Sequence, residues 1–132
     1  MSEDLTGQWI GRYAYALGGA AVPFEAELIH WGGALEGRTV EPNTFRTGAG
    51  PELTADIAGS VDGGFVAFTK RYRDRPGEGR PTYEGRLLLN GLRIEGLWRL
   101  ARPDWLTGSF TMVRTPRAAV RAARRASVEA PS

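Results

Sequence analysis

The strongest constraint on the fold is an alternation of apolar and polar residues that extends over most of residues 7–114. In one such stretch, Tyr83, Gly85 and Leu87 alternate with Glu84 and Arg86. A period of two residues places the two sets of side chains on opposite faces of a β-strand, whereas an amphipathic helix has a period of 3.6. The pattern therefore predicts antiparallel strands with one buried face and one solvated face.

Turn-forming residues divide the alternating region into eight segments. We predict strands at 7–16, 23–31, 34–41, 53–61, 64–72, 81–89, 92–100 and 104–114. The tight hairpin signals are Gly32-Gly33, Asp62-Gly63-Gly64 and Asn90-Gly91, and the longer connections are 17–22, 42–52 and 73–80. Short links without a crossover helix favour an all-β fold, an eight-stranded antiparallel up-and-down β-barrel with a short C-terminal basic tail. Alternate connections share one end of such a barrel. We therefore expect the tight turns to close one end, the base, and the longer connections to surround the other end, the open mouth.

Glycines recur on the predicted inward face, each one two residues after an apolar residue. They are Gly37, Gly59, Gly85, Gly96 and Gly108. Glycine within a strand permits the sharp coiling that closes a barrel, and it leaves room inside. The same alternation assigns Leu89 and Leu92 to the inward face. An eight-stranded barrel is either filled by side chains or holds one small ligand, and the sequence leaves both open.

Residues 1–114 form one predicted barrel domain, and residues 115–132 form an Ala/Arg-rich tail that is disordered or a short helix. The tail carries four arginines and one glutamate, whereas the whole chain has a formal net charge of only +2. A near-neutral barrel with a basic tail gives no reason to expect a nucleic-acid partner. No apolar stretch approaches the roughly 20 residues that span a bilayer, and the acidic N-terminus does not resemble a secretory signal. We therefore expect no membrane partner and a cytoplasmic protein.

The chain has no cysteine and a single histidine, His30. This composition removes the usual ligands of structural zinc and of iron–sulfur clusters, and it removes thiol nucleophiles. The sequence also has no nucleophile elbow, phosphate loop or dinucleotide fingerprint. We therefore expect no metal, no cofactor and no enzymatic activity, and we expect His30 to have a structural role near the closed end.

Gly7-Gln8-Trp9, at the start of the first predicted strand, resembles the Gly-x-Trp signature of the calycin group, which includes lipocalins, fatty-acid-binding proteins and avidins. Arg114, at the end of the last strand, is similar to the arginine that lipocalins pack on this tryptophan. The resemblance implies a cation–π pair between Trp9 and Arg114 at the closed base. It also implies a structural role for both residues.

Within this group the chain is most similar to the avidin and streptavidin family, over residues 7–114. The similarity lies in the run Phe68-Thr69-Lys70-Arg71-Tyr72-Arg73 and in Tyr83-Glu84-Gly85 some ten residues later. It implies an aromatic ligand box on the middle strands and the seventh strand. The matching positions are Phe68, Tyr83 and Trp98, and those that match the polar biotin-binding set are Gly11, Tyr15 and Thr39.

The alternation, which places every second residue of a strand on the inward face, and the resemblance together define a candidate ligand site. It lies in the half of the barrel near the mouth. Its residues are Tyr13, Tyr15, Thr39, Phe68, Lys70, Tyr72, Tyr83 and Trp98. Lys70, the only lysine, shares its parity with Phe68 and Tyr72, which predicts that it points inward. Its ammonium would then hold an anionic group or attack a carbonyl; alternatively, it reaches water or pairs with Glu41.

The predicted rim loops carry five basic and five acidic residues, so we expect a solvated rim without a net field. These residues are Arg46, Arg73, Arg75, Arg80, Arg102, Glu41, Glu52, Asp74, Glu78 and Asp104.

Three functional hypotheses follow from this sequence. The leading one is a barrel that binds a small apolar or aromatic molecule, with or without a carboxylate, through its mouth. The second is a filled barrel that serves as an oligomerisation or protein-interaction module, including as a homo-oligomer, through Ile10, Trp31, Leu97 and Trp105. The third is avidin-like biotin binding, or an enzyme that uses Lys70.

Overall fold

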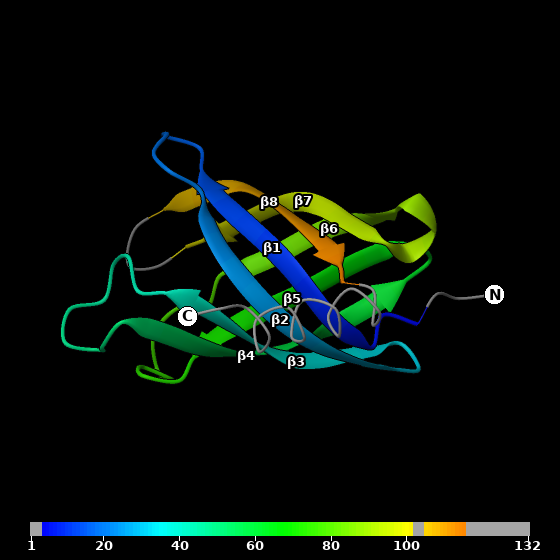
Figure 1. The fold of residues 1–132 in the computed structure, drawn as a ribbon, viewed down its shortest axis with the longest axis horizontal. Helices are drawn as coiled ribbons and strands as arrows, with labels where there is room; N and C mark the ends of the chain where they lie inside the picture. Colours follow the sequence, from blue (N-terminus) through cyan, green and yellow to red (C-terminus); the bar gives the residue numbers. More distant parts are fainter. Residues whose placement is uncertain (1–3, 102–104, 116–132) are drawn as a thin grey trace, which may run out of the picture.

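The computed structural model describes residues 4–101 and 105–115, which form a closed barrel of antiparallel strands (Figure 1). The strands are β1 (Gly7–Tyr15), β2 (Val22–Trp31), β3 (Ala34–Pro42), β4 (Glu52–Asp62), β5 (Phe65–Tyr72), β6 (Thr82–Leu88), β7 (Arg93–Leu100) and β8 (Leu106–Arg114). Their order around the barrel follows the chain, and β1 closes the barrel by pairing with β8, from Trp9 opposite Arg114 to Tyr15 opposite Gly108. The predicted up-and-down barrel is confirmed. No described helix is long and apolar enough to cross a membrane.

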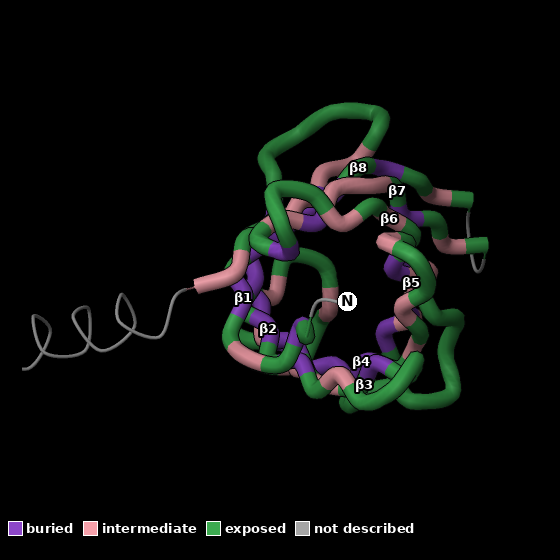
Figure 2. The backbone as a smooth tube through the Cα atoms, turned by 90° about the vertical axis from the view of Figure 1, so that its right-hand side faces the viewer, coloured by how far each residue is buried: buried purple, intermediate pink, exposed green. Residues whose placement is uncertain are grey.

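The strands lie within one or two residues of the predicted segments. Inward-facing residues are buried along every strand, and the ring of strands is visible in a view along the barrel axis (Figure 2). The expected tail falls, from residue 116 onward, outside the described residues.

The two ends of the barrel differ as predicted. The short β2–β3, β4–β5 and β6–β7 connections share the end on the right in Figure 1, and the longer loops share the other end. The β6–β7 connection differs in detail, because residues Leu89–Gly91 form a short turn, η1, in which every residue has a positive φ. Leu89 has a φ of 54°, which takes the backbone out of the strand conformation. The expected inward placement of Leu89 and Leu92 is therefore wrong, since they are 65% and 50% exposed.

The N-terminal segment closes the base of the barrel. Leu5 is fully buried, and its carbonyl oxygen accepts a hydrogen bond of 2.9 Å from the Trp9 indole nitrogen. The Leu5 amide donates to Nδ1 of His30 at 3.1 Å, so the histidine anchors this segment. The Arg114 guanidinium lies 5.9 Å from the centre of the Trp9 ring and donates to the Thr6 carbonyl oxygen. The predicted Trp9–Arg114 pair at the base is thus present.

The inward glycines allow neighbouring strands to approach closely, and Gly108 is the tightest case. A Cβ atom at Gly108 would lie 1.7 Å from the Ala14 carbonyl oxygen on β1 and 2.6 Å from Nε1 of Trp98. Trp98 donates a hydrogen bond of 3.0 Å to that same oxygen. The glycine therefore makes room for the contact between β1 and β8 and for the position of the Trp98 ring.

Replacing Gly108 with Ala should destabilise the barrel by about 1–3 kcal/mol, the usual penalty for overpacking. The free energy of unfolding in urea measures this effect. Gly77→Ala is the matched control, because a Cβ atom there meets nothing within 4 Å. Equal stability of the two variants would contradict the close approach of β1 and β8 at Gly108.

Candidate functional site

The barrel interior is filled in its middle layers by aromatic rings. The ring of Phe68 on β5 stacks on that of Tyr83 on β6, with centroids 4.9 Å apart and planes 8° from parallel. Phe110 on β8 meets the Tyr83 ring edge to face at 4.9 Å, and Trp98 on β7 continues the stack at 6.4 Å. Such offset and edge-to-face pairs are the preferred aromatic geometries. Phe68 and the rings around it thus form a solid layer below the mouth.

Above this layer, the mouth contains a pocket of about 430 Å³. Five of the eight predicted ligand-binding residues line it, namely Tyr13, Tyr15, Tyr72, Tyr83 and Trp98. The loops add Phe45, Arg46, Arg75 and Glu78, and the strand ends add Leu100 and Leu106. The other three predicted residues, Thr39, Phe68 and Lys70, are buried but do not line this pocket. The interior is therefore filled below and hollow at the mouth.

Lys70 forms a buried ion pair with Glu41 beneath the pocket. Lys70 Nζ lies 2.7 Å from Glu41 Oε1, and both side chains are at most 1% exposed. The inward direction of Lys70 is confirmed. Its ammonium pairs with Glu41, which was one of the alternatives that the sequence left open. Glu41 itself, expected on the solvated rim, lies inside the barrel because it shares the inward parity of Leu35 and Thr39. That prediction for Glu41 was wrong.

Three tyrosine hydroxyls surround the ion pair. Tyr13 donates to Glu41 Oε2 at 2.5 Å, and Tyr72 donates to Glu41 Oε1 at 2.9 Å. Lys70 donates a longer hydrogen bond, of 3.4 Å, to the hydroxyl oxygen of Tyr83. The Lys70 ammonium also lies 5.0–5.3 Å from four ring centres, those of the three tyrosines and Phe24. Because the lysine is surrounded by rings and the carboxylate by donors, both buried charges are compensated.

Burial and the neighbouring carboxylate raise the pKa values of these phenols. Desolvation is the main cause for Tyr13, Tyr72 and Tyr83, and the charge of Glu41 adds to it. Desolvation lowers the pKa of Lys70, and the contact with Glu41 opposes this shift. The phenols therefore remain neutral in the folded protein at pH values where free tyrosine ionises.

This pattern predicts a loss of stability at alkaline pH. A phenol whose pKa is raised by folding stabilises the barrel fully below the unfolded-state value of about 10, and this contribution is lost as the pH rises above it. We expect a decrease in unfolding free energy of up to about 1.4 kcal/mol per pH unit for each buried phenol. Lys70 opposes this loss up to and around pH 10.4, because its lowered pKa means that the unfolded state binds more protons there, and it adds no slope once both states are deprotonated.

Urea unfolding between pH 8 and 11.5 measures this slope. Tyr72→Phe removes one buried phenol, so it should reduce the decrease in unfolding free energy per pH unit by the contribution of that phenol. A stability that stays constant above pH 10 would contradict the burial of the tyrosines around Glu41.

Thr39 lies deeper in the wall than expected of a ligand contact. It is 1% exposed, and its hydroxyl oxygen has no hydrogen-bond partner among the described residues. Its cross-strand neighbours are Ala26 on β2 and Ala55 on β4, whose methyl side chains offer no hydrogen-bonding atom. Thr39 is therefore buried in the wall of the barrel and does not line the pocket at the mouth.

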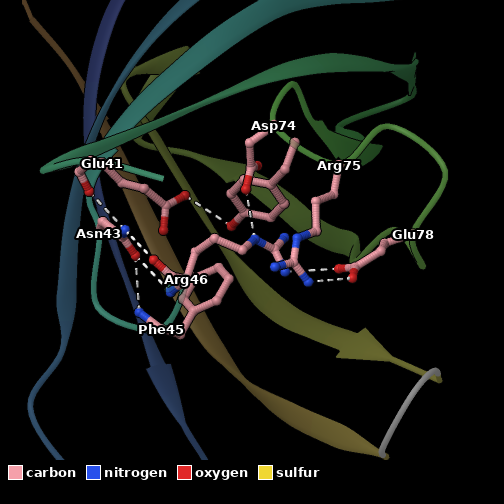
Figure 3. A network of polar contacts seen from close by, with 9 residues as sticks. Glu41, Asn43, Phe45, Arg46, Asp74, Arg75 and Glu78 are labelled. Carbon is pink, nitrogen blue, oxygen red and sulfur yellow. Dashed lines mark hydrogen bonds and ion pairs between the residues drawn. The ribbon is translucent and has the colours of Figure 1, made fainter. Parts of the chain in front are cut away.

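Arg46 joins the two long loops over one side of the pocket. Its guanidinium lies 2.7 Å from Asp74 and 2.8 Å from Glu78, which lie on the loop 73–81 (Figure 3). It also lies 5.2 Å from the ring centre of Phe45. The Asn43 side chain holds the loop 43–51 in shape by accepting hydrogen bonds from its amides and donating to its carbonyl oxygens. Specific ion pairs thus join the two loops of the rim, and the balanced net charge of the rim did not indicate them.

The apolar residues expected to form an interaction surface are exposed but scattered. Trp31 is 83% exposed at the base end of β2, whereas Trp105 is 76% exposed at the mouth end of β8. Ile10 on β1 and Leu97 on β7 are separated by β8. Single exposed apolar residues are common on protein surfaces. These four do not form one patch.

The site therefore offers a concave aromatic surface with phenolic hydroxyls, and the Glu41–Lys70 pair is buried beside it. Within residues 4–101 and 105–115, no group of three or more acidic or histidine side chains is placed to hold a metal ion. Compared with known proteins, the sequence matches no family model and no curated protein.

Proposed function

We propose that this protein binds a small, flat, predominantly apolar molecule in the pocket at the mouth of its barrel. The observation that carries the proposal is the pocket of about 430 Å³, walled by four tyrosines and Trp98. Binding sites for small molecules are typically concave, of roughly 300–1,000 Å³, and lined by aromatic side chains with a few polar groups. The packed aromatic layer beneath supports the proposal because it closes the pocket from below.

The charges around the pocket favour a neutral ligand. The Lys70 ammonium, the cation expected to hold a carboxylate, is already bound to Glu41 at 2.7 Å. Arg46, which lines the pocket, is paired with Asp74 and Glu78. A charged ligand would lose its hydration without gaining a free partner of opposite charge from these groups. We therefore place an uncharged ring system first among the ligand classes.

The resemblance to avidins supports a binding barrel more than it supports biotin as the ligand. Of the positions that match the polar biotin-binding set, Gly11 has no side chain and Thr39 does not line the pocket. Lys70, the residue on which an enzyme would depend, does not line it either. We accordingly propose binding without turnover, and biotin serves as a comparison ligand in the test.

The test is a titration with a panel of neutral bicyclic aromatic compounds and biotin, monitored by calorimetry and by the melting temperature. A ligand at a hundred times its Kd should stabilise the barrel by about 2.7 kcal/mol. Leu106→Trp, which places a larger side chain in the pocket, should abolish this stabilisation. Leu97→Trp makes the same change on the outer face, where the residue is 66% exposed, and should leave binding unchanged.

The outcome that contradicts the proposal is also specific. If no compound of the panel shifts the melting temperature of the wild-type protein, the mouth does not bind this class of molecule. If Leu106→Trp binds as tightly as Leu97→Trp, the ligand binds elsewhere.

A further inference from the structure

The buried ion pair determines which way the hydroxyl groups in the pocket can present their protons. Glu41 accepts from the hydroxyls of Tyr13 and Tyr72, so both protons are directed at the carboxylate and away from any ligand. These two oxygens retain only lone pairs, and they can only accept a hydrogen bond from a molecule in the pocket.

The hydroxyl of Tyr83 differs from these two, because it accepts a hydrogen bond and its own proton remains available. An ammonium has three donors and no acceptor, so the hydrogen bond of 3.4 Å from Lys70 occupies a lone pair on the Tyr83 oxygen. The Tyr83 proton has no acceptor among the described residues, although the side chain is 1% exposed. A buried O–H group without an acceptor is unfavourable, and Tyr83 lines the pocket. A ligand in the pocket is therefore placed to accept this proton.

The donor and the two acceptors are close together. Each of the three hydroxyls is one hydrogen bond away from the same Glu41–Lys70 pair. Their rings come from three strands, β1, β5 and β6, and all three rings line the same pocket. The polar part of the pocket thus combines the Tyr83 donor with two neighbouring acceptors, surrounded by aromatic rings.

We propose that the Glu41–Lys70 pair orients these hydroxyls so that the pocket recognises a neutral planar ring carrying an amide-type edge, with the ligand carbonyl accepting from Tyr83 and its N–H group donating to Tyr13 or Tyr72. This inference rests on the proposed function, and it specifies the chemical class of the ligand. Tyr83 is the specificity-determining residue, and Glu41 and Lys70 are positioning residues that act through the tyrosines.

A ligand series with one ring system and four substituents tests the inference by calorimetry. We use 2-naphthamide, 2-naphthoate, 2-naphthylmethylammonium and 2-methylnaphthalene, which share the apolar ring and differ in charge and hydrogen bonding. We expect 2-naphthamide to bind about tenfold more tightly than the other three, as a well-made hydrogen bond in a buried site implies. Tightest binding of the carboxylate or of the ammonium compound would overturn the inference.

Two conservative tyrosine variants locate the effect. Tyr83→Phe keeps the ring and removes the donor, so it should weaken 2-naphthamide about tenfold and leave 2-methylnaphthalene within about twofold. Tyr15→Phe removes the other hydroxyl of the pocket, which the ion pair does not contact, and it should reduce the preference for the amide less than Tyr83→Phe does. An unchanged preference in Tyr83→Phe would overturn the inference.

The double variant Glu41→Gln with Lys70→Met tests the orienting role of the ion pair, because it leaves every tyrosine in place. The amide should then lose most of its advantage over 2-methylnaphthalene, while the hydrocarbon still binds. A purely structural role of the pair would weaken both ligands equally, and this result would overturn the orienting role.

The failures of the two proposals are distinguishable. If none of the four compounds binds the wild-type protein, the proposed function fails and the inference fails with it. If 2-methylnaphthalene and 2-naphthamide bind equally, the binding function stands and only the inferred ligand class is wrong.

Discussion

Replacing Lys70 with Met is expected to lower the free energy of unfolding by about 3–5 kcal/mol, the cost of leaving one partner of a buried ion pair alone. Glu41 would remain inside the barrel, less than 2% exposed, with the hydroxyls of Tyr13 and Tyr72 as its remaining donors. A buried carboxylate that has lost its cation is unfavourable, because burial has removed its hydration and two hydroxyl donors replace only part of it. Urea unfolding at pH 7 measures the loss.

Two further variants make this result specific to the ion pair. Arg71→Met changes the next residue of β5, whose side chain is half exposed, and it should have a small effect. The double variant Glu41→Gln with Lys70→Met removes both charges and should recover most of the stability. If Lys70→Met were as stable as Arg71→Met, the burial of the pair inside the barrel would be contradicted.

Replacing Trp9 with Ala is expected to lower the free energy of unfolding by a similar amount, about 3–5 kcal/mol. The indole is 1% exposed and fills the base of the barrel. Its nitrogen donates a hydrogen bond to the Leu5 carbonyl oxygen, and its ring lies under the Arg114 guanidinium. The substitution therefore removes a large buried ring and releases the segment that closes the base.

Trp105→Ala is the matched control for this prediction, because Trp105 is 76% exposed. It should leave the unfolding midpoint almost unchanged. In Trp9→Ala the mouth pocket should retain its affinity for a ligand when the protein is folded, since Trp9 does not line it. Equal stability of the two variants would contradict the role of Trp9 at the base.

The barrel could be predicted from the sequence because its determinants are local. Alternation along each segment defines the inward face, and Gly32-Gly33 and Gly63-Gly64 mark the reversals. The connection at Asn90-Gly91 was also placed correctly as a reversal. Its conformation was not, because Leu89 adopts a positive φ that no residue pattern in this segment signals. Alternation predicts which side of a strand a residue faces only while the strand continues.

The candidate site was less predictable because its contacts join strands that are not neighbours. Parity directs Lys70 inward, but it does not identify what the ammonium will meet. Glu41 lies on β3 and Lys70 on β5, with β4 between them, so the pair forms across the curved interior. The inward parity of Glu41 with Thr39 was the signal that could have placed it inside the barrel.

The segments outside the strands contributed the features that were missed. Leu5 precedes the first strand, and nothing in its sequence context indicates that it is buried in the base. Arg46 lies in a loop without periodicity, and its ion pair with Asp74 depends on the relative position of two loops. Such contacts depend on the finished barrel, and a single sequence carries no local pattern for them.

The central claim is that a ligand occupies the mouth of the barrel, and its most direct test is the location of NMR shift changes on addition of 2-naphthamide. The predicted result is a set of changes centred on the Trp98 indole N–H and the tyrosine rings of the mouth, with the Trp9 indole N–H at the base unmoved. Changes confined to the outer wall, for example at Ile10 and Val113, would contradict the claim, because those residues line a separate hollow outside the barrel.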